Sequence, residues 1–179
     1  MRTGVWRSSM DLSWLNQLGP SEASDELLKC CGSLEWARRM TGSRPFKSLE
    51  QLQTRASEIW WALDRDDWLE AFRSHPKIGG SKAEEKVSDQ SRAWSGEEQS
   101  GVKSGSGQVL SELASLNRQY DDKFGFIFIV CATSKSSDEM LAILKSRLAN
   151  DAETELRNAA SEQEKITEIR LRKLISHNS

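Results

Sequence analysis

Residues 48–63 read SLEQLQTRASEIWWAL, and this stretch decides the fold class. Its apolar residues recur every three or four positions, at Leu49, Leu52, Ala56, Ile59, Trp60 and Leu63. That spacing places them on one face of an α-helix, whereas a half-buried strand would alternate in steps of two. Ser48 directly precedes the first apolar residue and is a typical N-cap. We therefore predict an amphipathic helix whose apolar face lies in the core.

The same pattern favours helices elsewhere, and only 3 Pro interrupt the chain. We expect an all-α protein. One helix ends near residues 31–32, and further helices cover roughly 33–40, 66–75, 108–123, 137–149 and 152–175. The run FGFIFIVCA at 124–132 fits a strand or a buried helical turn, and we predict no sheet from it. Residues 79–107 are rich in Gly and Ser and form the most loop-like stretch. Residues 1–20 are expected to be irregular, with Met10 an alternative start, and 21–179 form one domain.

Composition excludes several classes of function. With 25 Lys and Arg against 27 Asp and Glu, the net charge of −2 gives no electrostatic reason to bind nucleic acid or an anionic membrane. The run at 124–132 has less than half of the roughly 20 apolar residues that a membrane span needs. The 3 cysteines, two of them adjacent, suit a reducing intracellular compartment rather than a disulfide framework. With His75 and His177 as the only histidines, no zinc pattern is present, and we predict no metal site.

His75 is the first candidate for chemistry. Imidazole is the side chain whose ordinary pKa, about 6.5, suits proton transfer near neutrality. Pro76 ends the preceding helix and fixes the position of His75, and a helix C-terminus favours the protonated ring. The alternative is a purely structural histidine that hydrogen-bonds the last carbonyls of its own helix.

Ser95 and Glu98 form a second candidate, since SGEE at 95–98 matches a capping box. In that motif, the Ser95 hydroxyl accepts from the amide of Glu98, and the carboxylate accepts from the amide of Ser95. The structural interpretation is therefore a helix start. A functional one is compatible with it, because a hydroxyl, a carboxylate and the amide of Gln99 at a helix start could face a polar ligand.

Arg170 is the third candidate. It lies in the apolar stripe of the last helix, one turn after Ile166 and one turn before Leu174, while Arg172 points away from that stripe. A guanidinium in an apolar face either extends to its rim or is buried against an anion or polar ligand, because an unpaired buried charge is very costly. The pattern leaves both interpretations open.

Short motifs in a fixed order now place these residues in a known context. They are Cys30-Cys-Gly-Ser33 with Trp36, Arg44-Pro-Phe46, Trp68-Leu-Glu-Ala-Phe72, Ser74-His-Pro-Lys-Ile-Gly79, Ser95-x-x-Glu-Gln-Ser100, Lys123-Phe-Gly-Phe-Ile-Phe-Ile-Val-Cys131, Glu139-Met-Leu141 and Lys165-Ile-Thr-Glu-Ile-Arg-Leu171. Over roughly residues 26–176 the chain resembles the 2-oxo-4-hydroxy-4-carboxy-5-ureidoimidazoline (OHCU) decarboxylase family. The ordered set, with His-Pro, Glu-Gln and Lys-Phe-Gly-Phe, is more specific than any single motif.

The resemblance implies a role for each matching position. His75 and Glu98 would be the catalytic residues, with His75 as the general acid/base and Glu98 orienting it; Glu97 is the alternative to Glu98 if the alignment shifts by one residue. The substrate-binding positions implied are Pro76, Ser95, Gln99, Val130 through its main chain, and Arg170.

The resemblance also implies a function without a cofactor. The reaction would be decarboxylation of OHCU to (S)-allantoin, the last step of urate oxidation in purine catabolism. Further implications are a homodimer in the peroxisome or the cytoplasm and a fused or cooperating transthyretin-like hydroxyisourate hydrolase. The hypothesis from another class is a non-catalytic helical interaction module; a metal hydrolase is disfavoured by the lack of ligands.

Overall fold

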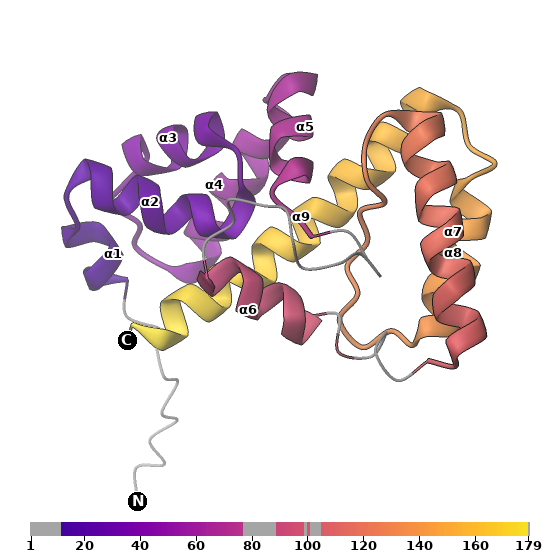
Figure 1. The fold of residues 1–179 in the computed structure, drawn as a ribbon. Coiled ribbons are helices and arrows are strands. Elements are labelled where there is room, and N and C mark those ends of the chain that lie inside the picture. The colour runs from indigo at the N-terminus through magenta and orange to yellow at the C-terminus, as the bar shows by residue number, and fades with distance from the viewer. Residues whose placement is uncertain (1–11, 77–88, 99, 101–104, 179) are drawn as a thin grey trace, which may run out of the picture.

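The protein is all-helical, as the sequence predicts. A computed structural model describes residues 12–76, 89–98, 100 and 105–178, and these contain nine α-helices and no strand. The helices are α1 (Ser13–Gln17), α2 (Pro20–Cys31), α3 (Leu34–Gly42), α4 (Leu49–Trp61), α5 (Arg65–Arg73), α6 (Asp89–Glu98), α7 (Gly107–Phe124), α8 (Ser137–Arg147) and α9 (Ala152–His177) (Figure 1).

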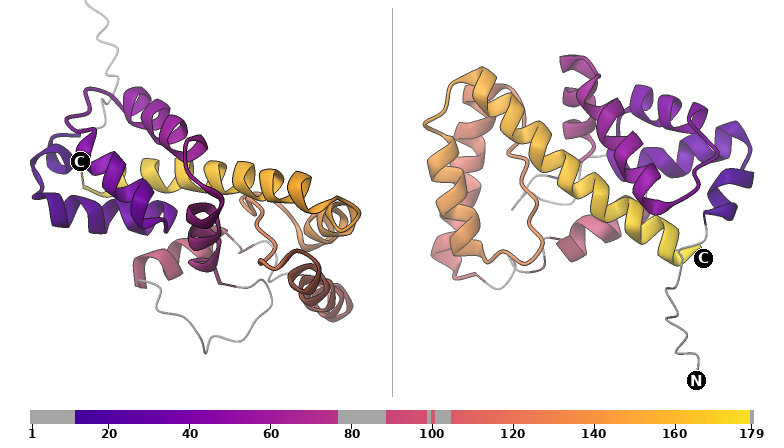
Figure 2. Two further views of the ribbon diagram at one scale, coloured as in Figure 1. Left: turned by 90° about the horizontal axis from the view of Figure 1, so that it is seen from above. Right: turned by 180° about the vertical axis from the view of Figure 1, so that it is seen from behind.

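Helix α9 is the central element of the fold. It runs through the molecule with α1–α5 on one side and the parallel pair α7 and α8 on the other, while α6 lies beside its C-terminal half (Figures 1 and 2). It packs against α2, α4 and α5. Its buried side chains include Ala159, Ala160, Ile166, Leu171 and Leu174. Every group of helices in the fold therefore meets α9.

The ends of the helices follow local sequence signals. The Ser48 hydroxyl accepts from the amide of Gln51 at 3.1 Å, which confirms the predicted N-cap of α4. Ser136 and Glu139 form a complete capping box at the start of α8. Gly32 ends α2 with a φ of +84°, a left-handed conformation that glycine adopts without strain.

Two expectations of irregular structure are wrong. Helix α1 lies in the stretch 1–20, because the buried side chains of Leu12 and Leu15 anchor it to the core. Helix α6 lies in the stretch 79–107, where Trp94 is buried and fixes a polar helix to the rest of the protein. Weak periodicity concealed both, since each helix is anchored by only one or two apolar side chains. Residues 79–88, 99 and 101–104 of the expected loop lie outside the described part.

The run at 124–132 is neither a strand nor a helical turn. Phe124 ends α7, and the residues that follow are irregular but buried. Side chains rather than a neighbouring strand satisfy two of its backbone groups. The carbonyl of Ile129 accepts from Arg147 Nη1 at 2.6 Å, and the amide of Cys131 donates to Glu162 Oε2 at 2.7 Å. Buried backbone groups need partners, and α8 and α9 supply these two.

The described helices include none that is both long and apolar enough to cross a bilayer.

Candidate active site

His75 lies where α5 leads into the centre of the protein. Helix α5 ends at Arg73, and the amide of His75 donates to the Phe72 carbonyl at 3.2 Å in the closing turn. The imidazole is only 6% exposed, and its Nε2 is 2.6 Å from Oε1 of Gln163 on α9. The ring therefore bonds to α9. The structural alternative instead required a bond to the last carbonyls of its own helix.

The environment of His75 favours the neutral ring. Burial first, and the positive charge of Arg170 second, together lower its pKa to about 3, although the hydrogen bond with Gln163 opposes them. The expectation that the helix end would favour the protonated ring is wrong. A helix terminus contributes at most about 2 kcal/mol, whereas moving a pKa from 6.5 to about 3 corresponds to roughly 5 kcal/mol.

Arg170 is buried, with 1% of its surface exposed. Its Nη2 donates to the hydroxyl of Ser95 on α6 at 2.9 Å. Arg172 is half exposed and pairs with Glu168 at the surface. Of the two interpretations of the arginine in the apolar stripe, the structure therefore selects a desolvated guanidinium held by a polar partner.

The capping box predicted at Ser95 is wrong. Helix α6 begins at Asp89, so Ser95 lies within the helix and its hydroxyl faces α9. The local motif was matched, but the helix had already begun six residues earlier. The physical reason is that Trp94 and Ser95 both turn toward the protein interior, where one is packed and the other binds Arg170.

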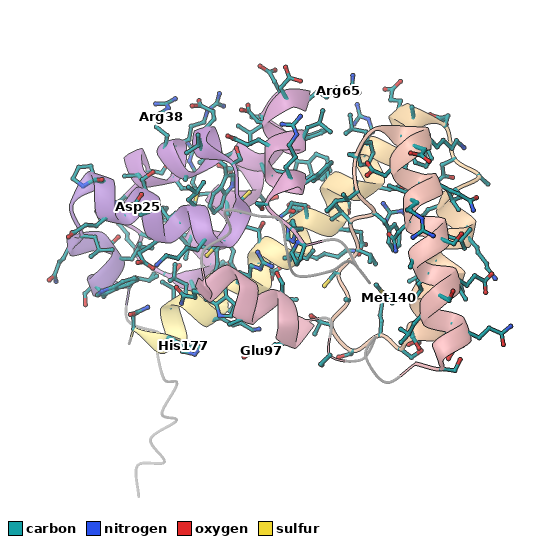
Figure 3. The ribbon with its side chains drawn as sticks, in the orientation of Figure 1. Asp25, Arg38, Arg65, Glu97, Met140 and His177 are labelled. Carbon is teal, nitrogen blue, oxygen red and sulfur yellow. The ribbon has the colours of Figure 1, made fainter. Side chains whose placement is uncertain are left out.

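Glu97, the alternative to Glu98, lies at the surface. It forms an ion pair with Lys173 at 2.8 Å, which lowers the pKa of the carboxyl group. Figure 3 shows Glu97 beside His177, where α6 meets the end of α9. Glu98 is the last residue of α6, but its side chain, like all of Gln99, lies outside the described part.

Two further positions implied by the resemblance, Pro76 and Val130, are both at least partly buried. Pro76 directly follows His75 and is partly buried, and Val130 is buried between the two bonded residues Ile129 and Cys131. A cavity of about 220 Å³ reaches His75 between α5 and the end of α7. Its other lining residues are Leu69, Phe72, Arg73, Asp121, Gly125, Phe126 and Ile127.

Sequence reasoning missed Gln163 and a buried ionic cluster. Gln163 lies seven residues before Arg170, and therefore on the same face of α9, which was a signal available from spacing. In the cluster, Arg147 of α8 pairs with Glu155 of α9, and the Tyr120 hydroxyl of α7 donates to the same carboxylate. Because Arg147 also holds Ile129, the cluster fixes the backbone next to Val130. Its partners come from separate helices, so no local pattern marked them.

The described residues contain no group of three or more His, Cys, Asp or Glu side chains that could hold a metal ion.

The fold and the site define an all-helical protein in which one long helix holds a buried histidine and a buried arginine. The model of the OHCU decarboxylase family matches residues 16–172, and the chain belongs to that family.

Two relatives and one solved structure show the extent of the similarity. The chain is 44% identical over 153 residues to the uric acid degradation bifunctional protein TTL of Arabidopsis thaliana, covering 85% of this chain and 47% of that protein. It is 31% identical to the uric acid degradation bifunctional protein PucL of Bacillus subtilis, covering 90% of this chain and 32% of the relative. The chain thus spans half or less of the length of these relatives. A crystal structure of OHCU decarboxylase in the presence of (S)-allantoin matches with a TM-score of 0.73 and 40% identity, covering 85% of this chain and 98% of that one.

Proposed function

We propose that this chain catalyses the cofactor-independent decarboxylation of OHCU to (S)-allantoin, the last step of urate oxidation in purine catabolism. The observation that carries the proposal is the similarity, over nearly the whole of the solved chain, to an OHCU decarboxylase crystallised in the presence of (S)-allantoin. The buried pair of His75 and Arg170 supports it, because the reaction needs a group that moves a proton and a cation that stabilises negative charge.

The substrate supplies its own electron sink in this reaction. When the bond between the ring carbon and the carboxylate breaks, carbon dioxide leaves and the electron pair moves into the adjacent imine of the imidazoline ring. The imine nitrogen takes up a proton from the solvent, the ring hydroxyl loses its proton and becomes the product carbonyl, and the neighbouring carbon gains a proton. A cofactor that accepts the electron pair is therefore not needed for this chemistry.

His75 is the proposed acid/base. Its low pKa keeps the imidazole unprotonated near neutral pH, so that it can accept the proton of the ring hydroxyl. It then returns a proton to the neighbouring carbon from one face of the ring. Delivery from one face explains why the proposed product is the single enantiomer, whereas spontaneous decay gives a racemate.

Arg170 is proposed to stabilise the negative charge that develops on oxygen, and Ser95 to orient its guanidinium. Glu98, Gln99, Pro76 and the main chain at Val130 are proposed to contact the substrate. The resemblance to the family supports these roles; Pro76 directly follows His75, and Val130 precedes Cys131, whose amide donates to Glu162 of α9.

Circular dichroism during the reaction tests the function. OHCU is generated from urate with urate oxidase and hydroxyisourate hydrolase, and the wild-type chain, His75→Ala and the control His177→Ala are added separately. We expect rapid growth of the (S)-allantoin signal with the wild type and the control, and its loss with His75→Ala. A folded wild-type chain that leaves the signal at the protein-free level would favour the non-catalytic interaction module instead.

We also propose that the chain forms a homodimer, works with or is fused to a transthyretin-like hydroxyisourate hydrolase, and acts in the peroxisome or the cytoplasm. Membership of the family supports the first two points, together with relatives named as bifunctional proteins of uric acid degradation. Sedimentation equilibrium tests the dimer, and localisation of the tagged full-length protein tests the compartment.

A further inference from the structure

We propose that Gln163 is a positioning residue that fixes His75 as the tautomer protonated on Nε2, so that Nδ1 is the nitrogen that exchanges a proton with the substrate. The second half of this statement rests on the proposed function. The first half concerns the protein alone and can be tested without substrate.

The orientation of the Gln163 amide is fixed from the side opposite His75. Its nitrogen donates to the hydroxyl of Thr167 at 3.2 Å and to the main-chain carbonyl of Cys31 at 3.5 Å. A carbonyl oxygen can only accept a hydrogen bond. If the amide were turned over, its oxygen would face the Cys31 carbonyl, and two buried acceptors would meet without a proton between them. The amide oxygen of Gln163 therefore points at the imidazole.

The proton in the contact with His75 must then come from the ring. The amide oxygen lies 2.6 Å from Nε2 and has no proton to donate, so Nε2 carries the hydrogen. A neutral imidazole has one N–H and one lone pair, which leaves the lone pair on Nδ1. Nδ1 is therefore the nitrogen that can act as the base.

A glutamine suits this position better than a carboxylate would. Within the described part of the chain, the charged groups around the ring are Arg170, on α9 like Gln163, and Arg73 and Asp121 in the walls of the cavity beside it. A carboxylate at position 163 would accept the same hydrogen bond but would favour the imidazolium, which has no lone pair to offer. The neutral amide fixes the ring and leaves it a base.

Nuclear magnetic resonance can read the tautomer directly. The sequence contains only 2 histidines, so long-range correlations between imidazole carbon-bound protons and ring nitrogens give two patterns, which His177→Ala assigns. In the uniformly nitrogen-15-labelled wild-type protein at neutral pH, we expect a protonated Nε2 and an unprotonated Nδ1 for His75, and a sheltered Nε2 proton that exchanges slowly with water. A protonated Nδ1 would overturn the proposal.

Three variants of the labelled protein extend the test. Gln163→Met removes the acceptor and should abolish the sheltered proton, whereas Gln119→Met, at an exposed glutamine of α7, should leave it unchanged. Gln163→Glu keeps the acceptor and should keep the proton while raising the pH at which His75 titrates. A sheltered proton that survives in Gln163→Met, or a Gln163→Glu protein whose His75 titrates like the wild type, would show that residue 163 does not hold the ring.

Activity provides the second readout. Gln163→Met should lower kcat by roughly tenfold with little change in KM, which is less than the factor of about 10² to 10⁴ that general acid–base catalysis supplies, because the base itself remains. A change in KM alone, with an unchanged kcat, would contradict the role of Nδ1. A wild-type chain that shows the expected tautomer but no decarboxylation would contradict the proposed function, whereas a proton on Nδ1 contradicts the present inference.

Discussion

Replacement of Arg147 by methionine is expected to destabilise the protein strongly. Arg147 pairs with Glu155, whose side chain is 0% exposed, and also donates to the Ile129 carbonyl. Methionine preserves much of the apolar stem but leaves the carboxylate buried without its cation. Removing one partner of a buried ion pair typically costs about 3–5 kcal/mol, because the remaining charge has lost its compensation.

The structure places the expected loss toward the lower part of that range. Without Arg147, the carboxylate still accepts from the Tyr120 hydroxyl and from Asn150 Nδ2, the latter at 2.8 Å. Each hydrogen bond to a charged group is worth about 1.5–3 kcal/mol, so these two donors offset part of the loss. For a domain of this size, 1 kcal/mol shifts Tm by about 2–4 °C, and we expect Tm to fall by roughly 6–15 °C.

Urea unfolding followed by tryptophan fluorescence measures the change, with Arg38→Met as the matched control. Arg38 also pairs with a glutamate, but its side chain is 71% exposed, so its loss should change the free energy of unfolding far less than the loss of Arg147. The double variant Arg147→Met/Glu155→Leu should be more stable than Arg147→Met alone, since no buried charge remains. A loss below about 1 kcal/mol in Arg147→Met, or a double variant destabilised by the sum of the single changes, would refute the reasoning.

Three further outcomes follow from the buried groups of the site. The pKa of His75 is about 3 in the folded protein and about 6.5 in the unfolded protein, so between these pH values only the unfolded state binds the extra proton. The free energy of unfolding should therefore fall as the pH drops below about 6.5, with a slope approaching 1.4 kcal/mol per pH unit from this group. Urea unfolding of His75→Gln should lack that component. Burial raises the pKa of Cys31 to about 12 and that of Cys30 further, so a thiol reagent at pH 8 should leave both unmodified in the native protein and modify all 3 cysteines in urea. Ser95→Ala removes an acceptor from the Arg170 guanidinium, so denaturation should show a loss of about 1–3 kcal/mol in the free energy of unfolding. Decarboxylase activity, measured by circular dichroism of the product, should also fall.

Features that depend on a few neighbouring residues could be predicted from the sequence. The N-cap at Ser48 and the end of α2 at Gly32 depend on residues within one helical turn. The place of Arg170 in the apolar stripe also follows from the sequence of a single helix, but its burial stayed open, because its partner Ser95 lies 75 residues away. For the helix ends, the deciding interaction lies within the neighbouring residues.

Features that depend on a distant partner could not be predicted in this way. The sequence around Ser95 satisfies a capping motif, but its hydroxyl binds a guanidinium 75 residues away, and that contact decides its role. The helix end at His75 favours the imidazolium, but burial against α9 opposes it with a larger free energy. The error in both cases has the same origin: a weak local preference competes with a stronger tertiary interaction.

Helix α9 explains how distant segments form one site. Glu162 and Gln163 are consecutive, so their side chains leave the helix about 100° apart. One holds the amide of Cys131 in the segment after α7, and the other holds His75 at the end of α5. Gln163 and Arg170 are seven residues apart, which places them on one face with a separation of about 10.5 Å along the axis. The distance between the proposed base and the proposed stabiliser of negative charge is therefore set by regular helix geometry, which makes it far less variable than a distance set by loops.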